Sequence, residues 1–100
     1  MLYQWDDLLS ITLLSNVPKF STGSDKLILD KTIFTRFTSA VQSSNLVIGT
    51  DAKDGDGYLI YDSNTQTLYY DANGNAAGAK VAFAQLVGVN SLSSSDFSLI

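Results

Sequence analysis

The side chains best suited to chemistry in this 100-residue chain are aspartates and asparagines placed at every second position. Asp54 and Asp56 precede a pair of aromatic runs, and Asp71, Asn73 and Asn75 follow it. Calcium takes roughly six to eight oxygen ligands from carboxylates, side-chain amides and backbone carbonyls. These residues are therefore the candidate metal ligands, with calcium as the candidate cofactor.

The spacing of Asp71, Asn73 and Asn75 matches the opening of an EF-hand loop. The match ends further along, because Ala76 and Ala82 occupy the positions where an EF-hand needs glycine and a bidentate glutamate. The segment is therefore not an EF-hand. Asp-Gly and Asn-Gly pairs also build turns without any metal, and we favour that simpler interpretation over calcium.

The aromatic runs at residues 58–61 and 68–70 flank a Ser-Asn-Thr turn, which predicts a β-hairpin. Such a hairpin would bring residues 57 and 72 close together, so that the two oxygen-rich segments could share one site. Exposed tyrosines can bind sugars or peptides, but packing across strands is their commoner role in a small sheet. We expect the packing role here.

The residue content excludes several classes of function. The chain has no cysteine and no histidine, so disulfides, thiolate chemistry and imidazole catalysis are excluded. The aspartates lie in glycine- and asparagine-rich turns, and no nucleotide-binding or Ser–His motif is present, so we do not expect an enzyme. Lys80 is the only basic residue after Lys53, which argues against nucleic acid. The apolar run at residues 8–14 is too short for stable membrane insertion.

The acidic residues bear on the fold, because all ten are aspartate and aspartate favours turns over helix interiors. We expect a mainly β fold, a small antiparallel sheet or sandwich with one or two short helices. Residues 1–22 form an N-terminal arm, as a short helix or an irregular segment, and residues 23–100 form the domain. Asp30 is the expected N-cap of a helix over residues 31–41, with Phe34 and Phe37 on its apolar face. Strands are expected at residues 26–30, 46–48, 58–62, 67–71, 80–87 and 97–100.

Four segments within residues 24–100 occur in the order used by one known family. They are SDKLILDKTIF, YLIYDSNTQTLYYDANGNAAGA, VAFAQLVGV and SLSSSDFSLI. Together they resemble the C-terminal region of secreted RTX proteins, the hemolysin-type calcium-binding proteins. That region follows the glycine-rich repeats and carries the type I secretion signal. The nonapeptide repeat itself does not occur in this chain, so the resemblance is to the cap that follows the repeats.

The resemblance implies a function for the last residues. Asp96, Phe97, Leu99 and Ile100 would form the export signal, with Ser98 in place of the apolar residue usual between Phe97 and Leu99. An ABC-type type I exporter would bind this region while the chain is unfolded. Folding would be completed outside the cell, where calcium is millimolar. The chain is thus expected to be the secretion and capping domain of a secreted protein whose main activity lies upstream.

Several alternatives stay open at this point. The chain could be a standalone calcium- or carbohydrate-binding β module, or a structural remnant without activity. Its last residues could equally be the final strand of the domain's own sheet, since a short apolar strand pairs readily with a sheet edge. A homodimer could form through an open sheet edge or through residues 2–14.

Overall fold

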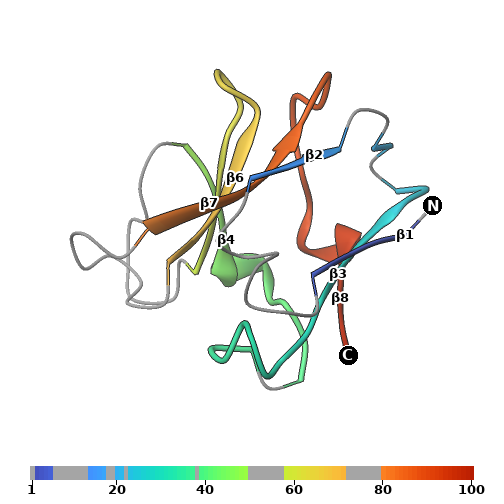
Figure 1. Ribbon diagram of the computed structural model, residues 1–100, viewed down its shortest axis with the longest axis vertical. Coiled ribbons are helices and arrows are strands. Elements are labelled where there is room, and N and C mark those ends of the chain that lie inside the picture. The colour runs from blue at the N-terminus through green and yellow to red at the C-terminus, as the bar shows by residue number, and fades with distance from the viewer. Residues whose placement is uncertain are drawn as a thin grey trace.

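Two β-sheets lie face to face in the part of the chain that the structure describes (Figure 1). A computed structural model describes residues 2–5, 14–17, 20–21, 23–37, 39–49, 58–71 and 80–100. Sheet A has three strands in the order β1-β3-β8, and sheet B has five in the order β2-β7-β6-β5-β4. The elements are β1 (Leu2–Trp5), β2 (Ser15–Val17), β3 (Lys26–Leu29), η1 (Ser43–Asn45), β4 (Leu46–Ile48), β5 (Leu59–Asp62), β6 (Thr67–Asp71), β7 (Lys80–Leu86), η2 (Ser94–Asp96) and β8 (Phe97–Leu99).

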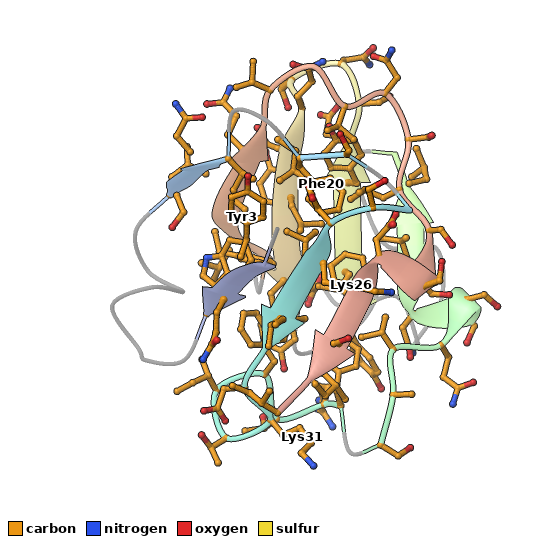
Figure 2. The ribbon with its side chains drawn as sticks, turned by 90° about the vertical axis from the view of Figure 1, so that its right-hand side faces the viewer. Tyr3, Phe20, Lys26 and Lys31 are labelled. Carbon is orange, nitrogen blue, oxygen red and sulfur yellow. The ribbon has the colours of Figure 1, made fainter. Side chains whose placement is uncertain are left out.

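The predicted mainly β class is confirmed, and the sheets pack as a small sandwich (Figure 2). The antiparallel pairing that we expected is present between β5 and β6 and between β6 and β7. The other neighbouring strands run parallel: β1 with β3, β3 with β8, β2 with β7, and β4 with β5. An alternating apolar pattern identifies a strand but carries no information about the direction of its partner.

The helix predicted over residues 31–41 is wrong, because the described residues of that segment form turns and bends. Asp30 still caps the first turn: its Oδ1 accepts from the Thr32 N–H at 2.8 Å, and its carbonyl accepts from the Phe34 N–H at 2.9 Å. The hydrogen bond from the Thr32 N–H lowers the pKa of Asp30 most, and the hydrogen bond from the Thr32 hydroxyl lowers it further. β-Branched threonines propagate a helix poorly, so burial of Phe34 and Phe37 decides the conformation. The two 3-10 turns η1 and η2 are the short helices within the described ranges.

The N-terminal residues contribute a strand to each sheet. Residues 2–5 pair with β3 and residues 15–17 pair with β7, where the sequence favoured a short helix or an irregular arm. Residues 6–13 lie outside the described residues. Trp5 is only 2% exposed and packs edge-on against Phe83, with 5.2 Å between ring centroids. Burial of this large aromatic ties β1 to the core that both sheets share.

The core lies between the inner faces of the two sheets. In sheet A, one inward row aligns Trp5 with Leu29 of β3. In β7, a bulge opposite Leu68 and Tyr69 breaks the alternation, so that Phe83 and Ala84 both become buried. The packing role expected for tyrosine is confirmed at Tyr61 and Tyr70, which are both buried. The core cluster comprises Trp5, Val17, Phe20, Leu27, Leu29, Phe34, Phe37, Leu59, Tyr61, Leu68, Tyr70, Phe83, Ala84, Leu86, Val89, Leu92 and Phe97.

The buried hydroxyl of Tyr61 predicts a loss of stability in alkali. It donates to the carbonyl oxygens of Val89 and, at 3.3 Å, Leu86. Burial raises the pKa of Tyr61 above its usual value, and the negative charge of Asp62 raises it further. The folded protein therefore holds this proton more tightly than the unfolded chain. The resulting stabilisation is complete below about pH 10 and is lost as the pH rises through the folded pKa.

We therefore expect the melting temperature to fall above about pH 10. In the Tyr61→Phe variant, which has no hydroxyl to ionise at this position, the decrease should be smaller. Thermal melts followed by circular dichroism across this range measure the effect. An equally steep decline in the variant would contradict a role for Tyr61.

Candidate functional site

The terminal motif proposed as an export signal forms the edge of sheet A. Asp96 ends η2, and the three residues of β8 pair in parallel with β3. The strand pairing continues at Ile100, whose N–H donates to the Leu29 carbonyl at 3.1 Å and whose carbonyl accepts from the Lys31 N–H at 3.3 Å. The alternative that this segment is the final strand of the domain's own sheet is thus observed.

Asp96 joins two distant parts of the backbone. Its side chain is 1% exposed; Oδ2 accepts from the Ser93 N–H at 2.9 Å, and Oδ1 accepts from the Gly23 N–H at 2.8 Å, 73 residues away. Gly23 has a φ of 83°, a left-handed conformation that favours glycine. Nearby, the Lys26 ammonium donates to the Ser95 carbonyl. The carboxylate therefore holds the start of β8 against the loop that leads into β3.

The other motif residues differ in how far the fold hides them. Phe97 is 6% exposed and belongs to the core cluster, and Leu99 is partly buried against it. Ile100 is 50% exposed. The fold therefore accounts for the apolar character of Phe97 and Leu99 and for the carboxylate of Asp96, but packing leaves half of the Ile100 surface in solvent.

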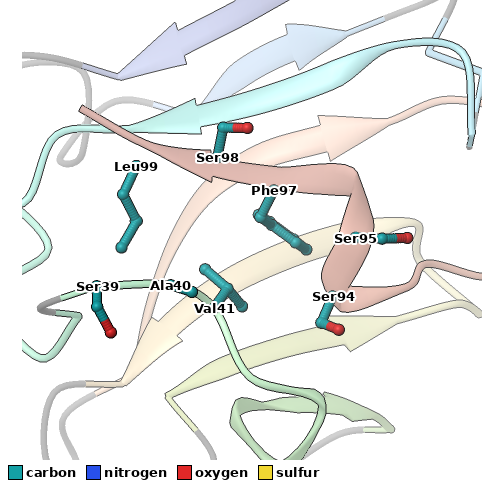
Figure 3. A pocket seen from close by; sticks show the side chains of 8 residues that line it. All are labelled: Ser39, Ala40, Val41, Ser94, Ser95, Phe97, Ser98 and Leu99. Atoms are coloured by element: carbon teal, nitrogen blue, oxygen red, sulfur yellow. The ribbon is translucent and has the colours of Figure 1, made fainter.

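A groove of about 370 Å³ lies beside the outer edge of β8 (Figure 3). One wall is β8 with η2, and the other is the segment at residues 39–41. The side chains of Val41, Phe97 and Leu99 point into it, whereas the Ser98 hydroxyl points away. Its described lining residues are all uncharged: Ser39, Ala40, Val41, Ser94, Ser95, Phe97, Ser98 and Leu99. These described residues therefore offer hydroxyls and apolar surface, and none of them is an acid or a base.

The candidate calcium ligands are described only in part. Asp54, Asp56, Asn73 and Asn75 lie outside the described residues. Asp71 is the last residue of β6 and is 4% exposed. Within the described ranges, no group of three or more acidic side chains comes together as a metal site.

The hairpin nevertheless places the flanks of both oxygen-rich segments side by side. The Asp71 N–H donates to the Tyr58 carbonyl at 2.8 Å, and Asp71 lies opposite Lys80 in the ladder between β6 and β7. Residues 58, 71 and 80, which border residues 50–57 and 72–79, thus meet at one end of sheet B. The predicted closeness of the hairpin ends is confirmed at Tyr58 and Asp71.

Comparison with known proteins assigns no family. No protein-family model matches the chain, and neither the curated proteins nor the solved structures give a match. Among the described residues, no helix is both long enough and apolar enough to cross a membrane.

Sequence reasoning missed the bond between Asp96 and Gly23 and the groove beside β8. A local signal for part of this geometry exists. Ser93 and Asp96 are three residues apart, the spacing of a capping box, and each side chain accepts from the backbone near the other. That pattern identifies Asp96 as a structural residue, although it gives no indication that Gly23 is the second donor.

Proposed function

We propose that this chain is the non-enzymatic C-terminal domain of a secreted RTX-type calcium-binding protein. In this proposal a type I ABC exporter binds Asp96, Phe97, Leu99 and Ile100 in the unfolded chain, and the same residues later close the fold. The ordered motifs within residues 24–100 support the family. The observation that carries the proposal is that the motif forms an edge strand, which can remain undocked until the rest of the fold is in place.

Burial explains why recognition would precede folding. Asp96 and Phe97 are 1% and 6% exposed, so an exporter that contacts their side chains must meet them before β8 docks on β3. Ile100 remains half-exposed in the fold. A contribution of Ile100 to export would therefore reflect recognition far more than stability, because an exposed side chain contributes little to folding.

The test is export of a passive reporter fused upstream of residues 1–100, in cells with and without a type I exporter. We expect export that depends on the exporter and disappears when Asp96–Ile100 is deleted. The substitutions Ile100→Asp and Leu14→Asp form a matched pair, because their side chains are 50% and 53% exposed and only Ile100 belongs to the motif. Ile100→Asp should reduce export strongly and Leu14→Asp should not.

Retention of the reporter in cells that contain the exporter, or equal effects of the two substitutions, would contradict the proposal. The folded state of each variant is checked by its melting curve. Since both positions are half-exposed, we expect both melting temperatures to stay close to that of the parent chain.

A second candidate function is calcium binding by a standalone β module. The meeting of residues 58, 71 and 80 at one end of sheet B favours it, because two oxygen-rich segments border these positions. If calcium binds the folded state but not the unfolded chain, it raises the melting temperature. We expect Asn73→Ala or Asp71→Ala to reduce the difference between melts in calcium and in chelator.

Asp62→Ala is the matched control for calcium, because Asp62 lies at the opposite end of the hairpin and accepts from the Asn64 N–H. That variant should retain the full calcium-induced difference. Identical melting curves of the parent chain in calcium and in chelator would exclude this second function.

A further inference from the structure

The outer edge of β8 presents backbone groups in a fixed pattern. The Ile100 N–H donates to the carbonyl of Leu29, the last residue of β3, and the Ile100 carbonyl accepts from the N–H of Lys31, two residues further on. Successive residues of a strand direct their backbone N–H and carbonyl groups to opposite edges of the strand. The backbone groups of Ser98 therefore also point towards β3, whereas those of Phe97 and Leu99 point towards the open edge. The N–H of Phe97 already donates to the Ser94 carbonyl. The edge therefore offers one donor, the Leu99 N–H, and the carbonyls of Phe97 and Leu99.

The surroundings of this edge leave room for an added strand. The groove of about 370 Å³ lies along β8, and its described lining carries no charge. Charged side chains, prolines and covering elements are the usual protections of an edge strand. Within the described residues, β8 pairs with β3 alone, and no strand pairs with its other edge. The segment at residues 39–41 lies across the groove from that edge.

The pattern of groups on β8 is complementary to itself. When two copies lie antiparallel with Ser98 opposite Ser98, each Leu99 N–H meets the Phe97 carbonyl of the other copy. This is the geometry of a non-hydrogen-bonded antiparallel pair, which is flanked on both sides by hydrogen bonds. This pairing does not use the Phe97 N–H, which already donates to the Ser94 carbonyl. The two Ser98 hydroxyls, on the outer face of sheet A, would then lie close enough to bond.

We propose that β8 pairs antiparallel with β8 of a second copy of this chain, centred on Ser98, to give a two-fold dimer with one continuous six-stranded sheet. The arrangement is isologous, as in most homodimers. Two hydrogen bonds and a short strand make a small contact, so the dimer forms weakly and is populated only at high protein concentration. This inference goes beyond the proposed function and does not depend on it.

A cysteine cross-link tests the register. The chain has no cysteine, so Ser98→Cys introduces a single thiol. Residues in a non-hydrogen-bonded pair have Cα atoms about 4.5 Å apart, which a disulfide can span. Ser95→Cys is the matched control, because Ser95 is exposed and close to the same edge but is not opposite itself in the dimer. Under mild oxidation we expect Ser98→Cys to form covalent dimers at least about tenfold faster, although Ser98 is the less exposed position.

Substitution of Leu99 tests the hydrogen bonds. Proline at position 99 removes the donor on the open edge and leaves the bonds to β3 intact, as proline does on other edge strands. Leu99→Ala removes the side chain but keeps that donor. In sedimentation equilibrium at up to about 1 mM, we expect the parent chain and Leu99→Ala to dimerise and Leu99→Pro to remain monomeric. Equal cross-linking of the two cysteine variants, a monomeric parent chain, or dimerisation of Leu99→Pro would each overturn the proposal.

Discussion

Replacing Phe34 with alanine is expected to lower the free energy of unfolding by about 3–5 kcal/mol. The Phe34 ring is fully buried, with its centroid 5.0 Å from that of Tyr70 and 5.1 Å from that of Phe83. Truncation would open a cavity where a turn packs against sheet B. Small domains are stable by only about 5–15 kcal/mol, so this loss removes a large share of the total. Urea unfolding at equilibrium measures it.

The neighbouring residue Thr35 supplies the control for Phe34. It is exposed within the same turn, so Thr35→Ala should change stability by less than about 0.5 kcal/mol. A helix at this place would instead gain stability from alanine, because threonine is the poorer helix former. A loss below about 1 kcal/mol in Phe34→Ala, or a clear gain in Thr35→Ala, would contradict the turn and its packing.

The strands from residue 26 onward were predictable from local pattern. The predicted strands at residues 26–30, 46–48 and 58–62 coincide with β3, β4 and β5 to within a residue at each end. The hairpin and the terminal strand agree equally well. Each of these segments concentrates β-branched, leucine or aromatic residues between turn-forming residues, so local preference and burial favour the same structure.

The failures have a common physical cause. Residues 31–37 contain phenylalanines at a spacing that suits both a helix and a pair of turns, and only contact with Tyr70 and Phe83 selects the turns. The strands at residues 2–5 and 15–17 depend on β3 and β7, which lie far along the chain. In both cases the deciding contact is tertiary, and local sequence carries no record of it.

The candidate site at the terminal motif also has a part that local sequence predicts and a part that depends on tertiary contact. The strand at the terminal motif followed from its apolar residues. The second partner of Asp96 is the N–H of Gly23, which no local pattern connects to residue 96. Sequence reasoning could identify Asp96 as a motif residue but could not predict that the fold buries its carboxylate.

Replacing Asp96 with alanine is expected to lower the free energy of unfolding by about 3 kcal/mol. The substitution leaves the N–H groups of Ser93 and Gly23 without their carboxylate, at a position that is 1% exposed. Asp30→Ala is the matched control, because Asp30 also accepts two hydrogen bonds, both from Thr32, but at an exposed place. Its loss of stability should be clearly smaller than that of Asp96→Ala, since water can replace the carboxylate there. Equal losses in urea unfolding would contradict the structural role of the buried Asp96.

The direction in which Asp96→Ala changes export separates the two roles of this residue. A destabilised domain presents its terminal strand more often in the undocked form, so a role in folding alone would leave export unchanged or raise it. If the exporter instead binds the Asp96 side chain in the unfolded chain, export falls although the undocked form is more populated. Under the proposed function we expect the fall. Phe34→Ala provides the comparison, because it destabilises the same fold through a residue outside the terminal motif, and its export should not decrease.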